Sequence, residues 1–356
     1  MANSFHKSFQ INGISFKSVE EILAHVSQIS AEMHEFLSDW FSNEKTILVK
    51  TSGSTGIPKT IALQKEFMIN SAIATATYFN LPQKTTALLC LPITYIAGKM
   101  MLIRAITLGW HLDIVEASSN PLEKISKSFD FSAMIPLQLE NSLQHLHLIK
   151  KLIVGGGAVS QQLQEKIQTI DCKVFATYGM TETITHIAIK KLNHTQISPT
   201  FFEVLPNVSI YKDHRDCLVI DAKNISEKVI FTNDIVQLVS KNKFEILGRF
   251  DNIINSGGIK LQPEIIEEKL SEIIKLRFFV AGIPDEKLGE KLVLLIESEG
   301  KIDKEDVYKS TLFSQIKTLK NISKFEIPKE IVILNNFNET TSGKIQRKST
   351  LESHHF

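Results

Sequence analysis

The segment from Lys50 to Thr60 gathers hydroxyl, glycine and lysine residues in one short stretch. It follows an apolar strand-like run and precedes residues with helical spacing. Small residues let backbone N–H groups approach an oxyanion, hydroxyls add donors, and Lys59 supplies positive charge. Pro58 has no N–H and stands where a Walker A loop needs glycine. The sequence predicts a phosphate-binding loop here, with a surface turn as the alternative, and its residues are Thr51, Ser52, Gly53, Ser54, Thr55, Gly56 and Lys59.

Two later segments have residue types suited to a nucleotide. Gly155, Gly156 and Gly157, followed by Ala158, would let a flat purine lie against the backbone, and a bare turn is the alternative. Thr181 can donate to a phosphate, and Glu182 offers a hard oxygen ligand to Mg²⁺. An isolated Thr–Glu pair more often caps a helix, so these residues gain meaning only with the rest of the pattern.

Charged residues nearer the carboxy terminus extend the pattern. Asp234 can accept hydrogen bonds from both ribose hydroxyls, and Arg249 can donate to a nucleotide, although a surface ion pair is the alternative. Lys344 follows Thr341, Ser342 and Gly343, and a lysine in such a polar segment is by default interpreted as a solvated surface residue.

In this order the segments resemble the motifs of the acyl-adenylate-forming enzymes, the superfamily of acyl-CoA synthetases, nonribosomal adenylation domains and luciferases. Six matches span residues 51 to 345. They are the phosphate loop at 51–59, the adenine-side loop at 155–158, the magnesium and phosphate motif at 178–183, the ribose turn at 232–234, the hinge with its following loop at 248–258, and the lysine motif at 341–345.

The resemblance implies ATP and CoA as co-substrates and Mg²⁺ as the metal. It assigns Lys344 and Lys59 to catalysis as cations, because joining a carboxylate to the α-phosphate brings two anions together, and it assigns Thr181 to catalysis as a donor to the phosphate. Tyr178 and Gly179 join the adenine and ribose residues, and Glu182 holds the metal. After adenylation the small domain would swing about the hinge at Asp251 and present Gly257 and Gly258 to the CoA channel.

The sequence departs from the family pattern in its short amino-terminal part, at Tyr95, at Asn233, and at Ile259 and Lys260 after the two glycines. Only fifty residues precede the phosphate loop, so most of one subdomain would be missing. Tyr95 stands where many members have histidine, and Asn233 stands where glycine is common in the ribose turn.

The length, residues 135–139 and residues 178–183 resemble short o-succinylbenzoate–CoA ligases of menaquinone biosynthesis. That acid has an aromatic ring and two carboxylates, so a cation should hold the unreacted one. Lys99, Arg104 and His186 are the candidates, with a snorkelling side chain or an ordinary buried histidine as alternatives. Two other functions stay open: adenylation of another aryl or acyl acid with CoA or a carrier-protein thiol as acceptor, and nucleotide binding without catalysis.

Alternating strand-like and helical stretches predict a layered α/β fold. Strand-like runs occur at Thr46–Lys50, 87–91, 151–154 and 173–176, and helical spacing at 63–79 and 160–169. Short alternating segments at 208–211, 217–220, 229–231, 235–239 and 243–247 predict an antiparallel β section. A helix over 263–275 then restarts the pattern, so we expect a large domain over 1–248 and a small mobile α+β domain over 249–356.

Composition excludes several classes of partner. Forty Lys and Arg against 39 Asp and Glu give a net charge of +1, which leaves no basic field for nucleic acid. The most hydrophobic stretch, 87–110, is interrupted by charged residues and does not predict a membrane span. Residues 1–21 do not have the pattern of a secretory signal. We expect a cytoplasmic protein whose three cysteines, Cys90, Cys172 and Cys217, are buried thiols, with a catalytic cysteine as the alternative. The oligomeric state stays open.

Overall fold

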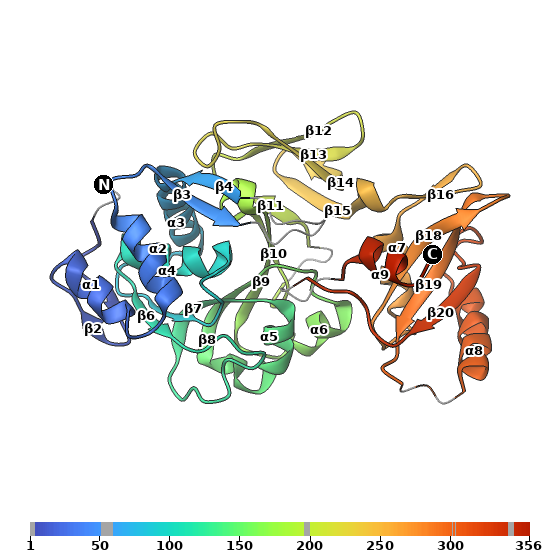
Figure 1. Ribbon diagram of the computed structural model, residues 1–356, viewed down its shortest axis with the longest axis horizontal. Helices are drawn as coiled ribbons and strands as arrows, with labels where there is room; N and C mark the ends of the chain where they lie inside the picture. Colours follow the sequence, from blue (N-terminus) through green and yellow to red (C-terminus); the bar gives the residue numbers. More distant parts are fainter. Residues whose placement is uncertain (1–3, 51–59, 196–199, 301, 303, 341–344) are drawn as a thin grey trace.

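The computed structural model describes residues 4–50, 60–195, 200–300, 302, 304–340 and 345–356. These residues form a large part around a 13-stranded sheet and a small part around a 5-stranded sheet (Figure 1). The expected mixed α/β architecture is confirmed. The loop predicted at 51–59 and the lysine predicted at 344 lie outside the described residues.

The large sheet runs in the order β12-β13-β14-β15-β11-β10-β9-β8-β7-β5-β6-β1-β2. From β1 to β9 neighbouring strands pair in parallel, and from β9 to β12 every pairing is antiparallel. The strands of the parallel section, with the edge strand β2, are β1 (Gln10–Ile11), β2 (Ile14–Ser15), β5 (Thr86–Leu89), β6 (His111–Ile114), β7 (Phe129–Met134), β8 (Ile149–Val154) and β9 (Lys173–Gly179).

Helices cover both faces of the parallel section. Residues of β5 alternate between two separate cores, with Ala87 and Leu89 in one and Leu88 in the other, as the two-residue period of a strand requires. The first core is closed by α1 (Val19–Val26), α2 (Ala31–Phe41), α3 (Lys65–Phe79) and α4 (Ile96–Leu108), and the second by α5 (Pro136–Asn141), η1 (Leu143–Leu148) and α6 (Gln161–Lys166).

Local sequence sets the ends of these helices. The hydroxyl of Ser18 accepts the N–H of Glu21 at the start of α1, and Ser30 does the same for Met33 at the start of α2. Helix α4 ends at Gly109, whose φ of 70° is the left-handed conformation that glycine adopts most readily. These residues mark where α1 and α2 begin and where α4 ends.

A hairpin of β3 (Thr46–Lys50) and β4 (Thr60–Gln64) precedes α3, and its pairing runs without a break from Thr46–Gln64 to Lys50–Thr60. The predicted strand at Thr46–Lys50 is therefore confirmed. The predicted start of the helix at residue 63 is wrong, because Leu63 pairs with Ile47 in this ladder and the helix begins at Lys65.

The antiparallel section expected between 204 and 247 is confirmed. The runs predicted at 229–231 and 235–239 belong to one strand, β14, because buried Thr232 and Asp234 continue the strand between them. A register shift between Ile235 and Val236 accommodates the change of pattern. The strands are β10 (His186–Lys191), β11 (Phe202–Val204), β12 (Ser209–Lys212), β13 (Cys217–Asp221), β14 (Ile230–Ser240) and β15 (Lys243–Arg249).

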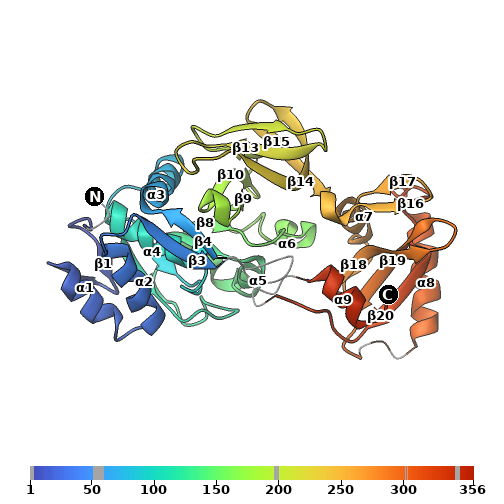
Figure 2. The ribbon, with the colours of Figure 1, turned by 45° about the horizontal axis from the view of Figure 1, so that its top comes forward.

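One turn of 3-10 helix, η3 (Phe250–Asn252), leads from β15 into the small part, which lies to one side of the large sheet (Figure 2). Apolar residues of the small sheet pack into two further cores, one on each face. Helix α7 ends at Leu270, earlier than the predicted 275, where Ser271 donates its N–H to Glu267. The other elements are β16 (Ile254–Ser256), β17 (Ile259–Leu261), α7 (Pro263–Leu270), β18 (Phe278–Asp285), β19 (Gly289–Glu297), α8 (Glu305–Thr318), β20 (Glu330–Leu334) and α9 (Arg347–Ser353).

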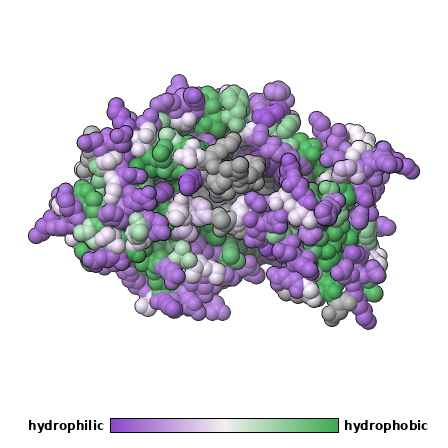
Figure 3. Space-filling model, in the orientation of Figure 1, coloured by the Kyte–Doolittle hydropathy of each residue, from purple (hydrophilic) through white to green (hydrophobic). Residues whose placement is uncertain are grey.

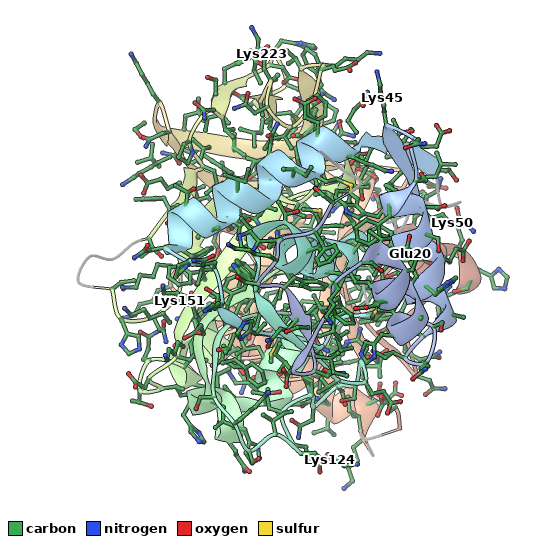
Figure 4. The ribbon with its side chains drawn as sticks, turned by 90° about the vertical axis from the view of Figure 1, so that its left-hand side faces the viewer. Glu20, Lys45, Lys50, Lys124, Lys151 and Lys223 are labelled. Atoms are coloured by element: carbon green, nitrogen blue, oxygen red, sulfur yellow. The ribbon has the colours of Figure 1, made fainter. Side chains whose placement is uncertain are left out.

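The surface seen in Figure 3 is mostly polar, with separate apolar patches on both parts. Lys45, Lys124 and Lys223 lie at distant points around the rim of another face (Figure 4), so basic residues there are dispersed. Among the described helices, none combines the length and the apolar character needed to cross a bilayer.

Candidate functional site

The glycine loop at 155–158 leaves the carboxyl end of β8, the edge of a parallel sheet where ligands bind in open α/β folds. Gly155 donates its N–H to the carbonyl of Met134 at the end of β7, over 3.1 Å. A Cβ on Gly155 would lie 2.7 Å from Oγ1 of Thr177, and Gly156 has a φ of +83°. The Thr177 hydroxyl leaves no room for a side chain at residue 155, and the positive φ favours glycine at residue 156, whatever the loop binds.

A tight reversal joins β9 to β10 at the same edge of the sheet. A Cβ on Gly179 would lie 2.1 Å from the carbonyl oxygen of Thr185, so only glycine allows the two segments to approach. The short η2 (Thr181–Thr183) follows, and then Ile184 takes a φ of 64° and a ψ of −64°. Thr185 donates its N–H to the carbonyl of Thr183 over 2.7 Å, which closes a strained γ-turn.

The hydroxyl of Thr183 holds this reversal from inside. It accepts the N–H of Met180 at 2.9 Å and lies 2.7 Å from the carbonyl oxygen of Thr185, toward which it donates. Thr183 is fully buried, whereas Thr181 is half-buried and Glu182 is exposed. The two residues expected to meet phosphate and metal are therefore accessible, on a turn whose inner residue fixes its shape.

Glu182 is compatible with a magnesium site of one particular kind. Within the described part of the chain, no group of three His, Cys, Asp or Glu residues could hold a metal by itself. Magnesium is usually held by one or two carboxylates together with substrate phosphates, and it keeps several waters. A single exposed carboxylate fits that mode and does not fit a metal held by protein ligands alone.

Three predicted adenine and ribose residues meet across the large sheet. The Tyr178 hydroxyl on β9 donates to Oδ2 of Asp234 on β14, over 2.6 Å. Arg249 on β15 donates from Nη1 to Oδ1 of the same carboxylate, over 3.2 Å. Burial, reinforced by the negative charge of Asp234, raises the pKa of Tyr178. The phenol therefore stays a hydrogen-bond donor and Asp234 stays an acceptor.

Arg104 lies in α4 with 2% of its surface exposed, and its partners are neutral. Nε donates to Oγ1 of Thr75 at 3.3 Å, Nη2 to Oγ1 of Thr185 at 3.2 Å, and Nη1 lies 3.7 Å from Sδ of Met101. Burial lowers the pKa of Arg104 to about 10, so the guanidinium is still charged at neutral pH. Among the described residues no carboxylate pairs with it, which is a costly state for a buried cation.

His186 lies next to Arg104 and is fully buried, with Nε2 at 3.4 Å from Oγ1 of Thr75. Burial, together with the charge of Arg104, lowers the pKa of His186 to about 3. His186 is therefore neutral at physiological pH and can act as a hydrogen-bond partner but not as a cation.

Lys99, the third candidate for a second carboxylate, does not join this cluster. Its Nζ lies 4.3 Å from the centroid of the Phe36 ring on α2. Burial lowers the pKa of Lys99, and the neighbouring carboxylates of Glu35 and Asp39 oppose that shift. Lys99 therefore packs α4 against α2.

Gly257 and Gly258 form the two-residue turn between β16 and β17, with φ values of +59° and +81°. A hairpin turn of this length favours glycine at positions with positive φ, so local geometry accounts for both glycines. Asp251 lies in η3, between β15 and β16.

Sequence reasoning missed the neutral groups around Arg104. Ser71 and Thr75 are buried on α3 four residues apart, and Ser71 lies within hydrogen-bond distance of Thr185. The sequence signal that could have found them is the helical spacing of these two hydroxyl residues, which places them on the same buried face as Met68, Ala72 and Ala76.

Comparison with known proteins identifies the class to which this fold and site belong. The family model of the AMP-binding enzymes matches residues 17–216. The chain belongs to the AMP-binding enzyme family, and the resemblance drawn from its motifs is confirmed.

Three similar proteins narrow the comparison. A 2-succinylbenzoate–CoA ligase of Listeria monocytogenes is 25% identical over 347 residues, covering 90% of this chain and 72% of that protein. An acyl-CoA synthetase (AMP-forming)/AMP-acid ligase II-like protein from Dyadobacter fermentans has a structure with a TM-score of 0.59 and 34% identity, covering 91% of this chain and 93% of that one. The o-succinylbenzoate–CoA synthetase of Bacillus subtilis, solved with ATP and magnesium, shares the fold at a TM-score of 0.70 and 17% identity, covering 94% of this chain and 82% of that one.

The state of the cysteines gives a prediction that separates a buried thiol from a catalytic one. Cys90, Cys172 and Cys217 are all buried and unpaired by disulfides. Burial raises the pKa of Cys90 and of Cys172 to about 12, and it also raises that of Cys217. We expect negligible alkylation by iodoacetamide at pH 7.5 in the native protein and modification of all three thiols in denaturant, measured by intact mass. Rapid labelling of one native thiol with loss of activity would favour a catalytic cysteine.

Proposed function

We propose that this protein is an ATP-dependent, AMP-forming acid–CoA ligase that converts o-succinylbenzoate to o-succinylbenzoyl-CoA in menaquinone biosynthesis. The family supports the nucleotide chemistry, and the name of the Listeria relative supports the acid. The observation that carries the choice of a dicarboxylic acid is Arg104, a buried cation whose partners are neutral in the described part of the chain.

The proposed reaction proceeds in two steps. A carboxylate oxygen of the acid attacks the α-phosphorus of ATP, and the bond from that phosphorus to the bridging oxygen of pyrophosphate breaks. The sulfur of CoA then attacks the acyl carbon, the bond to the phosphate oxygen breaks, AMP leaves and the thiol proton passes to solvent. The protein's task is to align two anions and offset their charge, with no protein nucleophile.

The chain's own residues divide that task. We assign the phosphates to residues 51–59 with Lys59, and the meeting point of carboxylate and α-phosphate to Lys344 and Thr181. Asp234, Arg249 and Tyr178 would hold the ribose, and the loop at 155–158 the adenine. Glu182 would hold Mg²⁺, which when bound offsets phosphate charge.

Arg104 is the proposed anchor for the carboxylate that does not react. A guanidinium can bind a carboxylate through two parallel hydrogen bonds, which fixes the orientation of the acid as well as its charge. Thr75, Thr185 and neutral His186 would surround that pair with polar but uncharged groups. Binding of the acid would supply the counter-charge that Arg104 lacks.

A panel of acids tests the proposed substrate. Pyrophosphate release with ATP and CoA should give the highest kcat/KM with o-succinylbenzoate, at least about tenfold above β-benzoylpropionate, which lacks the ring carboxylate. Equal turnover of benzoate or a medium-chain fatty acid would contradict the substrate. A requirement for carrier protein in place of CoA would favour the adenylation-enzyme alternative, and ATP binding without turnover of any acid would favour the non-catalytic one.

Replacing Arg104 with methionine separates a binding role from a structural one. We expect Arg104→Met to raise KM for o-succinylbenzoate on the order of 30-fold or more, because a buried charge pair is lost. KM for β-benzoylpropionate should change little. The melting temperature should hold or rise, since removing an unpaired buried charge relieves its desolvation cost. Lys99→Met, which removes a cation from the same helix, is the matched control; equal losses for both acids in Arg104→Met would make Arg104 structural.

The pH dependence follows from the two pKa values of the cluster. Arg104 has a pKa of about 10 and stays charged below about pH 9, while His186 has a pKa of about 3 and stays neutral above about pH 4. The ratio of KM values for β-benzoylpropionate and o-succinylbenzoate should therefore be constant from pH 6 to 8.5. It should fall only as Arg104 loses its proton. A ratio that changes near pH 6.5 would instead indicate a titrating histidine.

A further inference from the structure

The chain between the two parts is held by an unusual set of side-chain contacts at Asn233. Its Nδ2 donates to both carboxylate oxygens of Asp251, each over 3.1 Å. Its Oδ1 accepts from Nη1 of Arg215 over 2.9 Å. Asn233 belongs to the ribose turn on β14, and Asp251 belongs to η3, so one side chain joins the nucleotide side of the large sheet to the linker.

Arg215 fixes which way the Asn233 amide points. Its Nε donates to Oδ2 of Asp213 at 2.8 Å, and its Nη2 donates to the carbonyl of Thr232 at 3.0 Å. With the guanidinium held at two other points, Nη1 can offer a hydrogen only to the carbonyl oxygen of Asn233. The amide nitrogen must then face Asp251.

A second contact on Asp251 comes from the ribose residues. Arg249 donates from Nη2 to Oδ2 of Asp251 at 3.0 Å and from Nη1 to Asp234 at 3.2 Å. The Asp251 carboxylate is thus held by two donors that both belong to the large sheet. We call these hydrogen bonds, from Arg215 to Asn233 and from Asn233 and Arg249 to Asp251, the hinge latch.

Other contacts at the junction oppose the latch. Oε2 of Glu264, where α7 meets β15, is buried with no hydrogen-bond partner among the described residues. Gly248 of β15 approaches it so closely that a Cβ there would lie 2.6 Å from that oxygen. Oε1 of the same carboxylate accepts from Nδ2 of Asn252 in η3 and lies 3.9 Å from Nη2 of Arg347, so within the described chain only Oε2 lacks a partner. An unpaired buried oxygen is costly, and separation of Glu264 from Gly248 would let water reach it. An open surface pocket of about 510 Å³ is lined by Phe250 and Ile253 and by Arg215, whose Cζ lies 5.2 Å from the centroid of the Phe250 ring, so few other side chains cover this side of the linker.

The orientation of the small part shows which arrangement the latch holds. In Figures 1 and 2 the β16–β17 turn lies on the outer side of the small part, whereas the described residues between β20 and α9 extend toward α5 and α6. Those residues flank the lysine motif. In the proposed function, this is the arrangement for adenylation, with the glycine turn directed away from the site.

We propose that Asn233 is a positioning residue that holds the hinge in the adenylating arrangement, and that its loss shifts the enzyme toward thioester formation. The proposal rests on the proposed function. It assigns a role to the asparagine that stands where glycine is common in this turn, since glycine has no side chain to reach Asp251.

The test compares the two half-reactions in Asn233→Gly. Adenylate formation is measured as ATP–pyrophosphate exchange with o-succinylbenzoate, and thioester formation from pre-formed acyl-adenylate and CoA. We expect the ratio of the first rate to the second to fall about tenfold, in line with loss of a hydrogen bond to a charged group. A general loss of stability would slow both rates together and leave the ratio unchanged.

Asn242→Gly is the matched control. Asn242 lies in the turn at the far end of the same β14–β15 hairpin, and its Nδ2 also donates to a carboxylate, that of Glu203, over 3.3 Å. The ratio of adenylate formation to thioester formation in Asn242→Gly should equal that of the wild type. Arg215→Met should shift the ratio in the same direction as Asn233→Gly, and the double variant should shift it no further, because Arg215 acts through Asn233.

Two results would overturn the latch: an unchanged ratio in Asn233→Gly with an active wild type, or additive effects in the double variant. A wild type that forms no adenylate from any acid would refute the proposed function. Hydrogen exchange of residues 250–253 would then still show whether the hinge latch holds the linker. We expect faster exchange in Asn233→Gly and unchanged exchange in Asn242→Gly, and equal exchange in both would reject it.

Discussion

The reversal between β9 and β10 is the constraint on which the rest of the site depends. At this point the large sheet changes from parallel to antiparallel pairing, within the few residues from Gly179 to His186. Gly179 packs directly against Thr185, and Ile184 takes a strained left-handed conformation. The residue before the reversal, Tyr178, reaches the nucleotide side, and the residues after it, Thr185 and His186, reach Arg104. In the proposed function, one tight turn would thus set the distance between the two ends of a bound acyl-adenylate.

The buried charges at the two ends of the proposed site differ in whether protein groups satisfy them. Asp234 is buried, but it has Tyr178 and Arg249 as donors, so its charge is satisfied in the protein itself. Arg104 is buried among hydroxyls and a thioether, so its charge is left for a ligand to satisfy. A satisfied carboxylate is a rigid acceptor for neutral hydroxyls, whereas an unsatisfied cation selects an anion. This difference suits the proposed site, in which Asp234 would bind a ribose at one end and Arg104 a second carboxylate at the other.

The sequence predicted those features of the fold that local residue patterns determine, and it did not predict those that depend on tertiary contacts. The strand at Thr46–Lys50 and the antiparallel section follow from residue alternation, and both are present. The helix start at 63 was wrong because pairing of Leu63 with Ile47 is a tertiary contact that helical spacing does not report. Lys99 and Arg104 were indistinguishable as cations in an apolar stretch. Only the elements packed around α4 separate them, since α2 offers Lys99 a ring and carboxylates while α3 offers Arg104 hydroxyls.

Contacts between residues distant in the sequence also hold the linker between the two parts, and local patterns do not predict them. Asn233 and Asp251 are eighteen residues apart, and Arg215 is another eighteen residues before Asn233, so no sequence period connects them. The antiparallel pairing of β14 with β15 brings Asp234 opposite Arg249, and the linker then begins beside the ribose turn. Arg249 donates to both Asp234 and Asp251, so a ligand that takes the Nη2 hydrogen bond from Asp251 would weaken the hold of Arg249 on the linker. In the proposed function, nucleotide binding and the position of the small part would therefore be coupled through one guanidinium, and Asn233 would set how firmly the linker is held while that guanidinium is shared.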